Sequence, residues 1–143
     1  MFSSQPGPRH AGRSASQFYH RVGIESQVAG SNDAHRLVAM LFDGFFEALA
    51  QARGALLAGQ TEAKGRAIGH AMRIVDEGLK ASLDLTEGGA LAADLDALYA
   101  YVCQRLLRAQ VSNDDAALDE CRRLMQPLRE AWASIAPDAS QAA

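Results

Sequence analysis

The 143-residue sequence is poor in the residues that usually build β-sheets. It contains six valines, four isoleucines and two threonines, against 28 alanines. β-Branched residues favour strands, whereas alanine has the highest helix propensity. This imbalance argues against a sheet-based fold and predicts an all-α protein.

The sequence also lacks the features of several functional classes. Its formal net charge is −3, so no basic excess points to a nucleic-acid partner. No apolar run approaches the roughly 20 residues that a membrane helix needs, and no signal-peptide stretch stands at the N-terminus. The two cysteines, Cys103 and Cys121, form no metal-binding motif and are expected to be reduced thiols. These absences predict a cytoplasmic protein with no metal or other cofactor, no nucleic-acid partner and no membrane insertion.

Catalytic motifs are missing as well. No P-loop, Gly-x-Ser-x-Gly elbow or Glu-x-x-His pair occurs, so we expect no catalytic residues and no enzyme activity. One alternative stays open, because His70 lies within a predicted helix, as in histidine phosphotransfer bundles. That family has Lys three positions after the histidine and Gly next, where this sequence has Arg73 and Ile74. An exposed histidine on a solvated helix face is the simpler interpretation.

Hydrophobic periodicity predicts four helices between residues 31 and 136. Asp33 is the expected N-cap of the first helix and Gly59 its end, and Thr61 is the expected cap of the second. Residues 87–89 break the second helix, and residues 112–114 separate the third from the fourth. Short connections between long helices imply an antiparallel four-helix bundle, in which Pro127 is expected to kink the last helix. The expected core stripes include Leu37, Met40, Leu41 and Phe45 in the first helix and Leu91 in the third.

Three segments lie outside the predicted bundle. Residues 1–17 are rich in Ser, Gly, Pro and Gln and are expected to be disordered. Residues 18–30 have an apolar side interrupted by glycines, so we expect an N-terminal arm or lid that docks on the bundle. Residues 137–143 are expected to form a short flexible tail. The candidate lid residues are Phe18, Tyr19, Val22 and Ile24.

The first and third predicted helices have more apolar positions than one bundle core needs. A bundle helix buries about three positions in seven, and the first helix has a second apolar row beside its core stripe. This row either packs against the 18–30 arm or forms an exposed groove for an apolar partner segment. A weak homodimer is a further alternative that stays open. The candidate partner-binding residues are Val38, Phe42, Phe46, Leu49, Tyr99, Tyr101 and Leu107.

Several motifs then occur in one register over about residues 18–135. They are Tyr19-x-x-Val22-x-Ile24-Glu25-Ser26, Met40-Leu41-Phe42-Asp43-Gly44, Lys64-Gly65-x-Ala67-Ile68 and Gly88-Gly89-x-Leu91-Ala92-x-Asp94-Leu95. Trp132 follows at the place of a late tryptophan. Together these motifs resemble those of the flagellar export chaperones of the FliS family.

The resemblance implies a cytoplasmic, antiparallel helical bundle that binds the disordered C-terminal segment of flagellin. It also implies that binding prevents premature polymerisation and assists delivery to the gate of the type III export apparatus. In that family the N-terminal arm lies over part of the groove and moves when flagellin binds. By motif position, Tyr19 and Ile24 belong to this arm.

Overall fold

The computed structural model describes residues 31–135, which form four α-helices and one π-helix. The helices are α2 (Ser31–Leu57), α3 (Thr61–Arg73), η1 (Ile74–Lys80), α4 (Gly89–Ser112) and α5 (Asp115–Ser134). Helix η1 follows α3 without a break, and no strand occurs within residues 31–135. The predicted all-α class is therefore confirmed. The predictions for residues 1–17, 18–30 and 137–143 lie outside the described residues.

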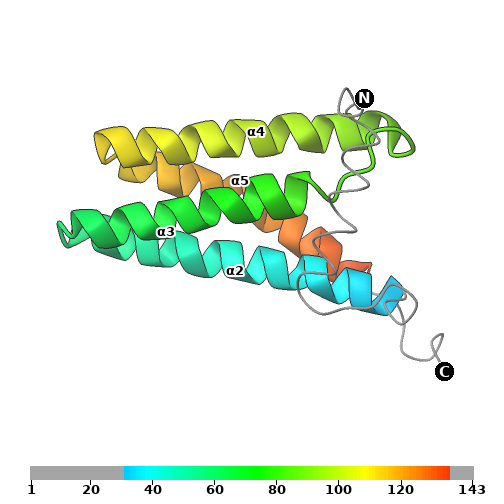
Figure 1. Cartoon of the computed structure of the whole chain (residues 1–143), viewed down its shortest axis with the longest axis horizontal. Coiled ribbons are helices and arrows are strands. Elements are labelled where there is room, and N and C mark those ends of the chain that lie inside the picture. The colour runs from blue at the N-terminus through cyan, green and yellow to red at the C-terminus, as the bar shows by residue number, and fades with distance from the viewer. Residues whose placement is uncertain (1–30, 136–143) are drawn as a thin grey trace, which may run out of the picture.

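The helices run alternately up and down, as an antiparallel bundle requires (Figure 1). At one end of the bundle, short turns at residues 58–60 and 113–114 join α2 to α3 and α4 to α5. At the other end lie the start of α2, the connection of residues 81–88 and the end of α5. Only the first end is therefore closed by two short turns, and the second leaves more room between helix termini.

Two helix termini are specified by local sequence signals. Gly59 ends α2 with a φ of +72°, a conformation that glycine adopts without steric cost. Asp114 is the N-cap of α5, and its carboxylate accepts a hydrogen bond from the backbone nitrogen of Ala117. The end at Gly59 was expected from the sequence, and the break at residues 112–114 was too, while the structure shows that Asp114 is the residue that caps α5.

Two expected N-caps and one expected helix end are wrong. Helix α2 already includes Ser31, so Asp33 lies inside its first turn, where it pairs with Arg36 instead of acting as the N-cap. Gln60, not Thr61, occupies the N-cap position of α3, without a side-chain cap bond. Helices α3 and η1 together form one continuous rod, the α3–η1 rod, which ends at Lys80, well before the break expected at residues 87–89.

Helix α5 contains Pro127 and continues through it to Ser134.

Helix α2, the α3–η1 rod, α4 and α5 all contribute side chains to the buried core. Its largest fully buried side chains include Phe45, Ile68, Leu79, Leu106 and Met125. Helix α2 packs against the α3–η1 rod and also against α5, so its buried face is wider than one stripe. The extra apolar row of α2 therefore contributes to the core.

Several core assignments made from periodicity are corrected by this arrangement. Phe42 is 3% exposed, and Val38 and Leu49 are also buried, although the sequence placed them outside the core stripe. Leu41, assigned to the stripe, is only partly buried. Met40 and Leu91, also assigned to stripes, are 60% and 69% exposed.

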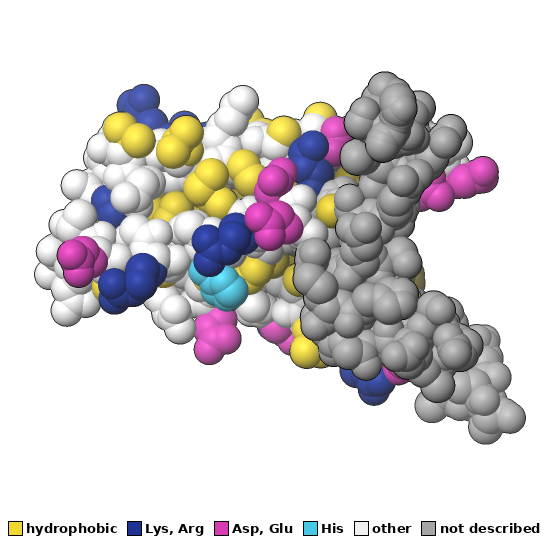
Figure 2. Space-filling model, viewed as in Figure 1, with side chains coloured by type: hydrophobic (Ala, Val, Ile, Leu, Met, Phe, Trp, Pro, Cys, Tyr) yellow, Lys and Arg dark blue, Asp and Glu magenta, His cyan; other side chains and the backbone are white. Residues whose placement is uncertain are grey.

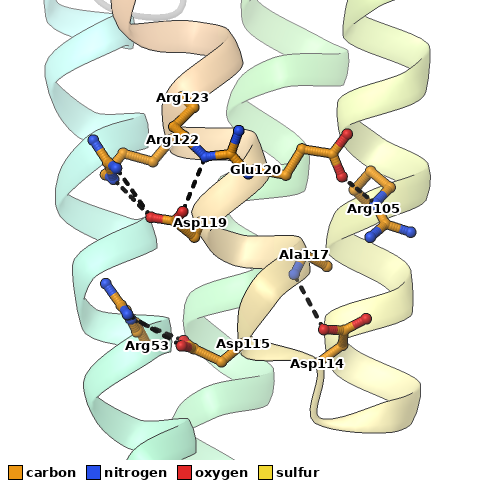
Figure 3. Close-up of polar contacts among 9 residues, drawn as sticks. All are labelled: Arg53, Arg105, Asp114, Asp115, Ala117, Asp119, Glu120, Arg122 and Arg123. Atoms are coloured by element: carbon orange, nitrogen blue, oxygen red, sulfur yellow. Dashed lines mark hydrogen bonds and ion pairs between the residues drawn. The ribbon is translucent and has the colours of Figure 1, made fainter.

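Ion pairs tie α5 to its neighbours (Figure 3). Arg53 of α2 pairs with Asp115, and Arg105 of α4 pairs with Glu120 at 2.7 Å. Asp119 pairs within α5 with Arg122 and Arg123. Such solvent-accessible pairs contribute little net free energy, so the apolar core decides stability.

Candidate functional site

An apolar pocket of about 630 Å³ lies at the open end of the described bundle. We call it the end pocket. Helix α2 contributes Ala34, His35, Val38 and Phe42, and α4 contributes Leu91, Leu95 and Tyr99. Leu79, Ser82 and Leu83 come from η1 and the connection after it, and Leu128, Ala131, Trp132 and Ile135 come from α5 and its end.

The architecture explains why the pocket lies there. Residues 81–88 form the long connection at this end, and α2 starts and α5 stops beside it. Because no short turn draws these four helix ends together, apolar side chains line the space between them without filling it. The result is a concave surface with few polar groups, which suits an apolar partner segment.

Burial at the pocket affects the ionisation of Tyr99. This side chain is 4% exposed, and desolvation raises the pKa of its phenol to about 12. Tyr99 is therefore neutral at physiological pH. The pocket wall that it forms carries no charge from this group.

Only three of the seven expected partner-binding residues line the end pocket. They are Val38, Phe42 and Tyr99. Phe46 and Leu49 instead line a second hollow of about 370 Å³ between α2 and α5, whose rim includes Arg53, Asp119 and Arg122. The seven residues therefore do not line one continuous hollow.

The remaining two expected residues lie on α4, outside both hollows. Tyr101 is 40% exposed, and its hydroxyl donates a hydrogen bond to Glu120 Oε2 at 2.6 Å. This hydrogen bond lowers the pKa of Glu120 and raises the pKa of Tyr101. Leu107 is 51% exposed.

Figure 2 shows one face of the molecule, on which hydrophobic side chains emerge between α3 and α4 among charged ones.

Two pocket residues, His35 and Trp132, hold each other through reciprocal contacts. The His35 Nε2 donates to the backbone oxygen of Trp132 at 2.7 Å, and the Trp132 Nε1 donates to the backbone oxygen of His35 at 3.0 Å. Their rings stack with centroids 4.6 Å apart and planes 7° from parallel. We call this pair the His–Trp clasp. It joins the first turns of α2 to the last turn of α5.

Sequence reasoning did not identify His35 as a site residue. A usable signal exists, because His35, Val38 and Phe42 are spaced three and four residues apart and so share one face of α2. Leu83 lies after the end of η1 and lines the pocket. No periodic pattern could place it there, since it follows the end of the helix.

The described residues offer no evident metal or membrane site. Within residues 31–135, no three His, Cys, Asp or Glu side chains gather in a way that could hold a metal ion. No described helix combines the length and apolarity that crossing a bilayer requires. His70, the residue of the phosphotransfer alternative, is exposed on α3.

Comparisons with known proteins identify relatives that align over most of the chain. The family model described as "Flagellar protein FliS" matches residues 15–139. The flagellar secretion chaperone FliS of Salmonella typhimurium is 44% identical over 122 residues, which are 85% of this chain and 90% of that protein. The chaperone FliSB of Pseudomonas aeruginosa is 44% identical over 117 residues, 82% of this chain and 91% of that protein. FliS of Escherichia coli is 37% identical over 81% of this chain and 85% of its own length.

Proposed function

The chain belongs to the FliS family of flagellar proteins, and from this premise we propose that it is a cytoplasmic export chaperone for flagellin. It binds the disordered C-terminal segment of flagellin, prevents premature polymerisation and assists delivery to the export gate. The observation that carries this proposal is the end pocket, an apolar hollow of about 630 Å³ in a bundle whose relatives are named secretion chaperones.

The physical demands of this task fit an apolar pocket. A flagellin terminus that folds only in the filament exposes its apolar side chains to water in the cytoplasm. Covering them removes apolar surface from water and contributes roughly 25 cal/mol for each Å² buried. Ordering the segment costs about 2 to 5 kcal/mol, so the bound segment must extend beyond one pocket to leave useful affinity. The second hollow, lined by Phe46 and Leu49, offers further apolar surface on α2.

The expected lid can be combined with this site. Residue 30 directly precedes Ser31, so the C-terminal end of the 18–30 segment is attached to the start of α2. Ala34 and His35, in the first turns of this helix, line the pocket wall. Thirteen extended residues span up to about 43 Å, which is ample to reach across the bundle end. We propose that Phe18, Tyr19, Val22 and Ile24 cover the pocket without a partner and leave when flagellin binds.

The proposed activity is binding, without a chemical step. The phosphotransfer alternative depends on His70, which lies on α3 outside the residues that line the end pocket. The named relatives are secretion chaperones, which favours binding over phosphotransfer.

A charge placed in the end pocket tests the proposal. Leu91 lines the pocket and is 69% exposed, so Leu91→Asp should fold normally. When flagellin covers the pocket, the carboxylate loses its water, and we expect affinity to fall at least about tenfold. The matched control is Val111→Asp, which lies on the same helix, is 74% exposed and lines neither hollow.

Calorimetric titration with intact flagellin and with flagellin lacking its C-terminal segment gives the readout. Binding of the intact protein alone supports the proposed partner, and loss in Leu91→Asp but not Val111→Asp supports the pocket. Equal affinity of both flagellins for the wild-type chain contradicts the proposed partner segment. Equal loss in both variants contradicts the end pocket as the site.

A further inference from the structure

The His–Trp clasp forms part of the end pocket and fastens two helix termini. His35 lies in the first turns of α2, and Trp132 lies in the last turn of α5, 97 positions further along the chain. Both residues also line the pocket. The contacts of the clasp therefore act on the surface that a partner would touch.

The backbone oxygen of Trp132 accepts a second hydrogen bond from outside its helix. It belongs to the last turn of α5, where backbone oxygens have no partner four residues further along the helix. The backbone nitrogen of Ile135 approaches this oxygen at 3.3 Å, and His35 Nε2 is closer at 2.7 Å. Since an oxygen of this kind only accepts, Nε2 must carry hydrogen. His35 thus caps α5 at the end where the helix dipole favours a donor.

The indole of Trp132 is held in three ways. Its Nε1 is hydrogen-bonded, one face stacks on the imidazole, and its own backbone oxygen is bound by that same imidazole. The ring cannot change rotamer without breaking the Nε1 bond and the stack. A wall residue fixed before binding loses less conformational entropy when the partner arrives.

We propose that His35 is a positioning residue that fixes Trp132 as a preorganised wall of the end pocket and so strengthens partner binding. This inference rests on the proposed function for the identity of the partner. Its physical basis is the clasp geometry, which is present in the chain alone. A purely structural clasp would stabilise the bundle without changing affinity, and this difference can be measured.

A double-mutant cycle separates the two roles. The full chain is compared with His35→Ala, Trp132→Phe and the double variant, by flagellin affinity and by thermal unfolding. We expect His35→Ala to weaken binding by about threefold to tenfold. In the Trp132→Phe background, the same change should weaken binding less than twofold, because the positioned indole is already gone. His70→Ala is the control, since His70 is exposed on α3.

The single tryptophan supplies an independent signal. Trp132 is the only tryptophan in the sequence, so intrinsic indole emission reports on the clasp alone. We expect His35→Ala to raise acrylamide quenching of this emission, and His70→Ala to leave it unchanged. If His35→Ala does not fold, His35→Phe keeps an aromatic ring while removing the Nε2 donor, and it should show both effects in weaker form.

Named results overturn the inference. Unchanged flagellin affinity in a folded His35 variant contradicts the positioning role, even where the thermal unfolding midpoint changes. An equal loss of affinity from His35→Ala in the wild-type and Trp132→Phe backgrounds contradicts it as well. If the wild-type chain does not bind flagellin, the proposed function fails. The positioning role is then tested with the apolar dye 1-anilinonaphthalene-8-sulfonate in place of flagellin. Energy transfer from Trp132 then reports dye in the pocket. Weaker dye binding in His35→Ala supports the positioning role, and equal binding overturns it.

Discussion

The Nζ of Lys64, on α3, lies 2.5 Å from the side-chain oxygen of Asn113, at the far end of α4. Lys64 is 3% exposed, and its Nζ also donates to the backbone oxygen of Gln110 at 3.0 Å. Asn113 has a left-handed backbone with a φ of 53°. The ammonium thus satisfies acceptors at the C-terminus of α4, where the helix dipole favours a cation.

Removing this ammonium should destabilise the bundle. We expect Lys64→Met to lower the free energy of unfolding by about 2 kcal/mol, because a charged donor is lost and the Gln110 and Asn113 oxygens lose their partner. Arg66→Met, two positions further along and exposed, should change it by less than about 0.5 kcal/mol. Urea denaturation measures both, and equal stability of the two variants contradicts the capping role.

A pair of glycines gives opposite expectations for the same substitution. A Cβ at Gly78 would lie 2.8 Å from Leu41 Cδ2, whereas a Cβ at Gly54 meets nothing within 4 Å. Gly54→Ala should therefore stabilise α2 by about 0.5 to 1 kcal/mol. Gly78→Ala gains the same propensity but must displace Leu41, so we expect it to be less stable than Gly54→Ala by about 1 to 2 kcal/mol. Thermal unfolding of the two variants checks this order, and a higher midpoint for Gly78→Ala would contradict the close approach of η1 to α2.

The buried thiol of Cys121 and the buried phenol of Tyr99 predict a loss of stability at alkaline pH. Burial raises the pKa of Cys121 from 9.0 to about 12 and that of Tyr99 from 10.0 to about 12. In the unfolded chain these groups ionise near their ordinary values, so above pH 9 the folded state binds more protons than the unfolded state. Stability should therefore be unaffected by these groups below pH 9 and fall as pH rises towards 12.

Thermal midpoints at about pH 8 and about pH 10.5 test this dependence. The decline between them should be smaller in Tyr99→Phe and in Cys121→Ala than in the wild-type chain, whatever each variant does to the midpoint at the lower pH. A decline of unchanged size in both variants assigns the alkaline sensitivity to other groups.

The N-cap of α5 can be tested without touching the core. Asp114→Ala removes the side-chain acceptor of the Ala117 backbone nitrogen, and we expect a loss of about 1 kcal/mol in unfolding free energy. Asp94→Ala, at an exposed position within α4, serves as the control for loss of a carboxylate. Denaturation midpoints of the two should differ, and coincident midpoints would mean that the cap contributes nothing.

Much of the fold follows from local features of the sequence. Abundant alanine and scarce β-branched residues determine that the chain is helical, because backbone propensity acts residue by residue. Gly59 and Asp114 mark helix ends because their effects are confined to one turn. The same rules misplaced Asp33, since an ion pair with Arg36 satisfies its carboxylate inside the helix.

The site was only partly accessible to such reasoning. Periodicity indicated that Val38, Phe42 and Tyr99 belong to apolar faces, and they line the end pocket. It could not tell that Phe42 is also core, because a helical face is defined by the sequence while its covering depends on neighbouring helices. Tyr101 and Leu107 were grouped with them as extra apolar positions of the third predicted helix, yet they line neither hollow.

The sequence by itself determined four helical rods and the apolar faces they carry, since both depend on spacings of three and four residues. Only the tertiary structure decided that His35 meets Trp132 and that an apolar pocket opens beside them. The two residues are 97 positions apart, and no local preference acts over that distance. Their contact exists because α2 and α5 pack against one another and bring the start of one helix to the end of the other.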